Sequence, residues 1–141
     1  MTDSLQELLD SWPEAQSQTR EAFLYLVREA EARPESSLSL VSRPGVSFSF
    51  RAETDNPAPD RDRPVYFLVD VIMSEAEPWF LSACFYENEI TDPEELGNPI
   101  PQGLFNDTGY CFDVEDKDPH LLAYLKERLA EAHASASGKR I

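Results

Sequence analysis

Basic residues are scarce in this chain. Only 12 lysines and arginines stand against 27 aspartates and glutamates, which gives a formal net charge of -15 at pH 7. Such a surface repels nucleic-acid phosphates and anionic lipids, because binding to either requires a basic patch, and the arginines here are scattered. Nucleic acid and membrane are therefore not expected as partners. A cationic partner, a metal ion or simple solubility fits this charge.

Long apolar runs are also missing. No stretch approaches the roughly 18 apolar residues of a membrane-spanning helix, and the opening MTDSLQELLDSW lacks the basic start and apolar centre of a signal peptide. The sequence therefore predicts a cytoplasmic protein. Thiols in that compartment are mostly kept reduced.

Cysteine, histidine and glycine are too few for the common site motifs. The two cysteines lie 27 positions apart, and only His120 and His133 are available to complete a four-ligand zinc site. With five glycines, the chain has no obvious phosphate-cradling loop, and it contains no G-x-S-x-G or H-E-x-x-H pattern. The sequence indicates no cofactor, and an enzyme is the less favoured class.

Residues 1–33 have helical periodicity. Leu5, Leu8, Leu9 and Trp12 follow the spacing that places side chains on one helix face. Ser11-Trp12-Pro13-Glu14 reads as a capping box with proline in the first turn, which predicts that a second helix starts there or that the first one kinks.

The period then changes to two, which predicts an antiparallel sheet over residues 37–116. Residues 37–53 form an expected hairpin around Pro44-Gly45, because this pair is a turn signal. VYFLVDVIM, WFLSACFYENEI and YCFDVED supply three further strands rich in β-branched and aromatic residues.

The remaining segments complete a single-domain prediction for residues 1–141. Residues 91–108 read as a long loop, residues 118–134 as a C-terminal helix, and residues 135–141 as a frayed tail. Two amphipathic helical ends must bury their apolar stripes on a sheet. The expected fold is therefore α+β, with five antiparallel strands and the terminal helices packed on one face.

Alternation along the strands separates an apolar face from a mixed one. The mixed face is typical of a solvated sheet surface or of a small-molecule or peptide site, since aromatic walls with a few convergent polar groups suit a ligand. Its candidate ligand-binding residues are Arg51, Tyr66, Asp70, Cys84, Tyr86, Cys111 and Asp113. Asp70 interrupts an apolar strand, so it is exposed, paired with a cation such as Arg51, or part of a site.

The two cysteines, in ACFYENE and YCFDVED, share this face. If their strands are neighbours, Cys84 and Cys111 lie within a few ångströms of each other. Reduced thiols that behave as small hydrophobic side chains are the plain interpretation. A redox-sensitive pair and a catalytic thiol are the alternatives, although no C-x-x-C motif, nearby cation or positioned base supports them.

Acidic residues gather at the ends of the same two strands, where they could bind a hard cation. None of them matches a calcium-loop pattern, and Asp92 and Asp118 precede prolines as helix caps do. The other acids are Glu87, Glu89, Glu94 and Glu95 after one strand, and Asp113, Glu115 and Asp116 around the other.

The order of segments resembles two groups of small proteins. TREAFLYLVREAEA, SLSLVSRPGVSFSF, VYFLVDVIM, WFLSACFYE, YCFDVED and PHLLAYLKERL follow the helix, strands, helix layout of the YdhG-like bacterial domains. The acidity and the same layout are similar to the frataxin iron chaperones. The resemblance covers layout without a motif, since SRPGV stands where YdhG-like domains have a glycine-methionine-proline strand signature, so it assigns no residues.

Three functions follow from these observations. The first is a binding module that holds a protein or small molecule on the mixed sheet face and the 91–108 loop. The second is an acidic metal-handling protein of the iron-chaperone kind. The third is a small enzyme that uses Cys84 or Asp70, which requires a base–nucleophile pair that the sequence does not display.

Overall fold

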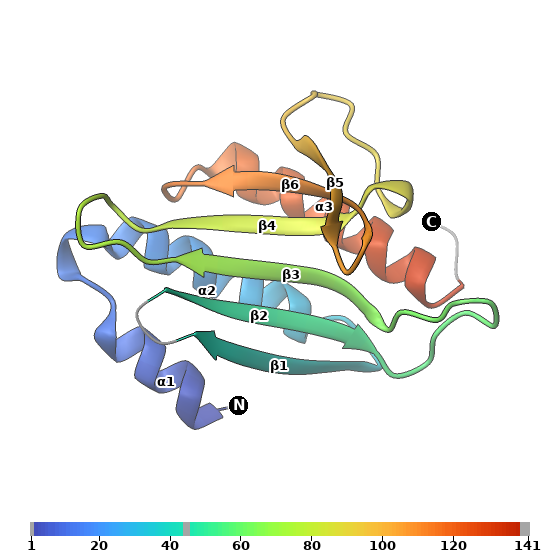
Figure 1. Cartoon of the computed structure of the whole chain (residues 1–141), viewed down its shortest axis with the longest axis horizontal. Helices are drawn as coiled ribbons and strands as arrows, with labels where there is room; N and C mark the ends of the chain where they lie inside the picture. The colour runs from blue at the N-terminus through green and yellow to red at the C-terminus, as the bar shows by residue number, and fades with distance from the viewer. Residues whose placement is uncertain (1, 44–45, 139–141) are drawn as a thin grey trace.

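A computed structural model describes residues 2–43 and 46–138. It is an α+β structure in which an antiparallel sheet is backed by helices α2 and α3 (Figure 1). The helices are α1 (Thr2–Ser11), α2 (Ser17–Glu31) and α3 (Pro119–Ala136), with short 3-10 turns η1 (Glu14–Gln16) and η2 (Glu87–Glu89). The strands are β1 (Ser36–Arg43), β2 (Ser47–Thr54), β3 (Val65–Ile72), β4 (Phe80–Tyr86), β5 (Asn98–Leu104) and β6 (Asp107–Val114).

The sheet has six strands, so the prediction of five is wrong. Their order is β1-β2-β3-β4-β6-β5, and every neighbouring pair is antiparallel. The additional strand is β5, which lies within the predicted 91–108 loop. Its sequence NPIPQGL contains two prolines and exposes every residue except Leu104, so it has neither alternation nor an apolar run. Proline is tolerated there because β5 is an edge strand.

The first 33 residues form a broken helix, as the sequence predicts, but the break differs in detail. The Ser11 hydroxyl donates to the Leu8 carbonyl at 2.9 Å instead of capping a new helix, and α2 begins only at Ser17. The capping-box prediction is therefore wrong, because the 3-10 turn η1 separates the two helices. Trp12, buried between them, packs on Phe23 with ring centroids 5.6 Å apart.

The predicted hairpin over residues 37–53 is confirmed as β1 and β2, which pair from Ser36 opposite Thr54 to Arg43 opposite Ser47. The expected Pro44-Gly45 turn lies outside the described residues. Strands β3 and β4 follow as a second antiparallel pair.

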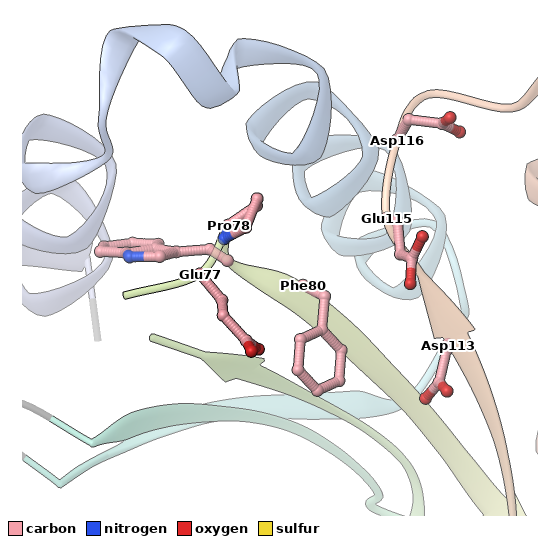
Figure 2. A pocket seen from close by; sticks show the side chains of 7 residues that line it. Glu77, Pro78, Phe80, Asp113, Glu115 and Asp116 are labelled. Carbon is pink, nitrogen blue, oxygen red and sulfur yellow. The ribbon is translucent and has the colours of Figure 1, made fainter. Parts of the chain in front are cut away.

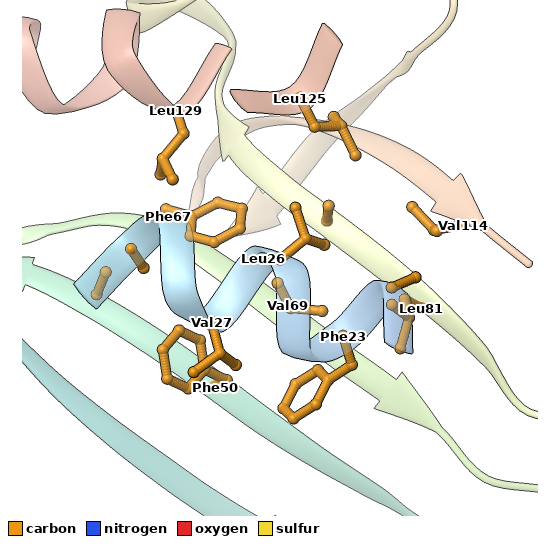
Figure 3. Packing of buried hydrophobic residues seen from close by; sticks show 14 of the residues in the cluster. Phe23, Leu26, Val27, Phe50, Phe67, Val69, Leu81, Val114, Leu125 and Leu129 are labelled. Atoms are coloured by element: carbon orange, nitrogen blue, oxygen red, sulfur yellow. The ribbon is translucent and has the colours of Figure 1, made fainter. Parts of the chain in front are cut away.

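One face of the sheet packs against α2 and α3. Figure 3 shows side chains of α2, α3 and the central strands meeting there, including Phe23, Leu26, Phe67 and Leu125. All four are fully buried or nearly so. Each such side chain contributes about 1.5–3 kcal/mol relative to exposure, which fixes the helices on this face and leaves the opposite face for other contacts.

Helix α3 starts as the sequence predicts. The Asp118 carboxylate accepts hydrogen bonds from the backbone N–H groups of His120 and Leu121, and Pro119 occupies the first turn. The helix continues to Ala136, so the first part of the expected tail is helical, and residues 139–141 lie outside the described part of the chain. Within the described ranges, none of the helices has both the length and the apolar character needed to span a membrane.

Candidate functional site

The strand registers arrange the mixed face in rows. Ser49, Asp70, Ser82 and Asp113 are direct cross-strand partners on β2, β3, β4 and β6. The next row contains Arg51, Leu68, Cys84 and Cys111. Alternation therefore assigned six of the seven candidates correctly to one face, although the ring of one of them, Tyr86, is covered. The other five are Arg51, Asp70, Cys84, Cys111 and Asp113.

Cys84 and Cys111 are joined by a disulfide. They are directly opposite on β4 and β6, with their Cα atoms 4.2 Å apart, so the predicted proximity is confirmed. The expectation of reduced thiols is wrong in this structure, because the strand register brings both side chains to the same point on one face. While this bond exists, Cys84 has no thiol to act as the nucleophile of the enzyme hypothesis.

Tyr66 does not lie on the mixed face. Ala52 is opposite Phe67 but Glu53 is opposite Val65, so Tyr66 is an extra, bulged residue in β3. The bulge breaks the alternation, and Tyr66 is fully buried on the helix side. Its hydroxyl is 2.6 Å from the Ser36 hydroxyl, and its ring lies edge-on to His133 of α3. Burial raises the pKa of the Tyr66 hydroxyl, although the Ser36 hydrogen bond opposes this.

Tyr86 is on the mixed face, but it is 1% exposed and cannot form a ligand wall. The Arg63 guanidinium lies 3.6 Å from the centre of its ring. Arg63 is held there by Asp107 at 2.7 Å and by Asn88 at 3.0 Å. Burial raises the pKa of the Tyr86 hydroxyl, and the nearby arginines only partly offset that rise.

The β5–β6 hairpin covers part of the mixed face. Figure 1 shows β5 crossing in front of β6 and β4, on the side away from the helices. Its last residue, Leu104, packs with Leu68, Cys84 and Tyr86 in a second small apolar cluster, to which Cys111 is adjacent. This hairpin divides the mixed face into a covered part around the disulfide and an open part beside β2 and β3.

The open part is a groove of about 270 Å³. Asp70 lies in it, half-buried, and has no hydrogen bond or ion pair with any described residue. Pairing with Arg51, one of the three alternatives that the sequence left open for Asp70, is therefore not formed. Arg51 instead donates to the Ser49 hydroxyl at 3.2 Å. The groove is lined by Arg43, Ser47, Ser49, Arg51, Leu68, Asp70, Gly103, Leu104 and Phe105.

Phe105 is the functional candidate that sequence reasoning missed. It stands at the tip of the β5–β6 hairpin, 51% exposed, with the Arg51 guanidinium 5.3 Å from its ring centre. Its backbone φ is 50° and that of Asn106 is 69°, as in a two-residue hairpin turn with both central residues left-handed. A bulky aromatic residue rarely adopts that conformation. The Phe-Asn pair gave no turn signal of the usual Asn-Gly kind.

A second groove, of about 560 Å³, lies on the same face beside β4 and β6, across the strands from the first. Figure 2 shows Glu77, Phe80, Asp113 and Glu115 around it, with Asp116 above. Strands β4 and β6 carry Phe80 and Asp113, and the segments beside these strands supply Pro78 and the other acids. The mixed face is thus basic toward β2 and acidic toward β6, a polarity that the sequence alone did not indicate.

Comparison of the chain with protein-family models, curated proteins and solved structures found no match. The resemblance to YdhG-like and frataxin-type layouts stays a prediction. The site must therefore be interpreted from its own geometry.

Asp92 has a structural role that the sequence did not predict. Its carboxylate accepts hydrogen bonds from the hydroxyls of Tyr110 and Tyr124 and from the backbone N–H groups of Leu96 and Gly97. Burial favours the neutral acid, but these four donors outweigh it and lower the pKa of Asp92 to about 2. The same contact raises the pKa of Tyr110 to about 12. Asp92 thus organises the turn before β5, not a helix.

The metal-handling and enzyme hypotheses were compared with the contacts within residues 2–43 and 46–138. No three histidine, cysteine or carboxylate side chains converge there as metal ligands. His120, the possible base, is 2.8 Å from the Glu94 carboxylate, which raises its pKa, and this contact does not involve either cysteine.

Proposed function

We propose that this protein is a binding module whose sheet-face groove holds a small zwitterionic ligand, such as an amino acid or the end of a peptide. The proposal rests on the surroundings of Asp70. Asp70 is a half-buried carboxylate with no partner among the described residues, in a groove that it shares with Arg51. A partly desolvated carboxylate is costly unless a cation compensates it, so a ligand amine is the natural complement.

The guanidinium groups of Arg51 and Arg43 would bind the anionic half of the ligand. Arg51 is oriented by the Ser49 hydroxyl and by the face of Phe105, and Arg43 lies at the outer rim of the groove. Arginine binds carboxylates with two parallel N–H donors, which suits an amino-acid carboxylate. Leu68 and Leu104 supply the apolar surface between the two charges.

Size and strain support the same ligand class. A volume of about 270 Å³ is near the lower end for ligand sites, so it suits a small molecule. The left-handed backbone at Phe105 is costly for an aromatic residue, and such strain concentrates at ligand clamps. Phe105 would close over a bound ligand while remaining stacked on Arg51.

The test is a thermal-shift screen of the wild-type protein against the common amino acids and their dipeptides, followed by calorimetry. A ligand that raises the melting temperature should bind Asp70→Asn about tenfold more weakly or worse, because the ligand amine loses its charged partner. The matched control is Asp113→Asn, since Asp113 lies in the same cross-strand row but outside this groove.

Asp113→Asn should retain wild-type affinity. Equal losses in both variants would indicate a general charge effect and would contradict the proposed site. A screen in which no zwitterion raises the melting temperature would remove this ligand class.

A further inference from the structure

The two edges of the sheet differ in how they are protected. Edge strand β5 carries Pro99 and Pro101, its pairing with β6 is irregular, and it crosses over the sheet. Such features prevent another chain from adding a strand. The opposite edge, β1, has the sequence SSLSLVSR and contains neither proline nor an acidic residue.

The outward-facing backbone groups of β1 can be identified from its pairing. The N–H of Asp55 donates to the Glu35 carbonyl at 2.7 Å, so these opposed residues are a hydrogen-bonded pair. Such pairs recur at every second residue, which directs the backbone of Ser37, Ser39, Val41 and Arg43 toward β2. The remaining residues, Ser36, Leu38, Leu40 and Ser42, direct their N–H and C=O groups away from the sheet.

The side chains of β1 leave apolar surface uncovered. Leu38 and Leu40 touch the core cluster but are only half-buried, and Val41 is exposed on the other face. An added strand would cover part of all three side chains, and it would pair with the outward backbone groups of β1, which have no backbone partner among the described residues. Figure 1 shows β1 as the outermost strand on its side of the sheet.

The charges at the two ends of β1 indicate which strand would be added. Arg43 is at the carboxyl end, whereas Ser37, near the amino end, hydrogen-bonds to the Asp55 carboxylate. If a second β1 lies antiparallel with Leu40 opposite Leu40, Arg43 faces Ser37 and comes beside Asp55 of the second copy. Opposite residues of an antiparallel pair share a face, so the leucine sides of both strands coincide.

We infer that β1 is a self-association edge, at which two copies of this chain pair antiparallel to form a continuous sheet. The contact spans one strand per copy, so it is small and the dimer is weak and concentration-dependent. The net charge of -15 on each copy opposes association, and about 150 mM salt screens that repulsion beyond roughly 8 Å. This inference does not depend on the proposed ligand.

The test is sedimentation velocity in about 150 mM NaCl, with no amino acid added. The protein concentration is varied from roughly 10 µM to 1 mM, because a small interface gives a weak dimer. The mass of the wild-type protein should rise from 16.0 kDa toward twice that value. Ser42→Pro removes an outward N–H without breaking a β1–β2 bond and should stay monomeric. Ser42→Ala keeps the N–H and should dimerise like the wild type.

A second set of variants, in which the charges of Arg43 and Asp55 are exchanged, tests the same inference if Ser42→Pro affects folding. Arg43→Asp and Asp55→Arg alone should each weaken the dimer at least tenfold, and the double variant should recover it. A wild-type protein that is monomeric at 1 mM overturns the inference, and so does a dimer that tolerates Ser42→Pro in a folded chain. Failure of ligand binding would leave these masses unchanged, so the two proposals are separable.

Discussion

Asp92 and Asp70 are carboxylates on the same protein with opposite surroundings. Asp92 accepts hydrogen bonds from four donors, which lower its pKa to about 2. Asp70 has no hydrogen-bond donor among the described residues, although it is half-buried. The first carboxylate is therefore occupied in holding the chain together, whereas the second is available to a ligand.

The pKa of Asp92 predicts a stability that depends on pH. The folded pKa, about 2, is below the ordinary value of 3.8, so ionised Asp92 stabilises the fold above pH 4 and loses that effect as pH falls toward 2. Asp92→Asn should lower the free energy of unfolding at pH 7 by about 1–2 kcal/mol, a value reduced for solvent screening. Urea denaturation of both proteins should show this difference shrinking between pH 4 and pH 2. A difference that is constant over this range would contradict the assignment.

The β5–β6 hairpin is the element that turns a sheet face into a groove. It covers the disulfide with Leu104, brings Phe105 to Arg51, and begins after the turn that Asp92 stabilises. The Cys84–Cys111 bond closes a chain segment that contains both that turn and all of β5. The disulfide and the Asp92 carboxylate therefore both help to hold the irregular segment 87–107 on the regular sheet.

Removing the disulfide should destabilise this segment. For a separation of 27 residues, chain entropy predicts a loss of about 3.5 kcal/mol in the free energy of unfolding. The double variant Cys84→Ser, Cys111→Ser should show this loss in urea denaturation. Hydrogen exchange should accelerate more in residues 87–107 than in β2 and β3. Wild-type protein with reductant is the control and should match the double variant, and an oxidised wild type no more stable than this control would contradict the expected role of the bond.

The whole molecule carries excess negative charge while its mixed face is polarised. The 15 uncompensated acidic charges repel one another across the surface. The buried Arg61–Glu89 ion pair is shielded from solvent and is screened less by salt. Stability of the complete fold should therefore respond to ionic strength mainly through surface repulsion.

Added salt should raise the melting temperature. Between about 10 and 150 mM the screening length falls from roughly 30 to 8 Å, which weakens repulsion among exposed carboxylates. Calorimetry in NaCl and in choline chloride should give equal increases, because screening depends on ionic strength and not on the cation. A lower melting temperature in salt would contradict this account, and an increase with sodium alone would indicate specific cation binding.

The spacing of apolar residues in the sequence was sufficient to predict the helical ends, five of the six strands, and the sheet face on which Asp70, Cys84 and Cys111 lie. It was sufficient because a helix or strand that buries one face must repeat its apolar residues with the period of that structure. Three features depended on contacts between distant segments. The bulge in β3 places Tyr66 on the helix side of the sheet. The proline-containing β5 forms a strand only because it pairs with β6, and Phe105 contacts Arg51 only because of the hairpin turn between them. Local sequence patterns indicate which side chains are buried, whereas the register between strands determines which of these side chains come into contact.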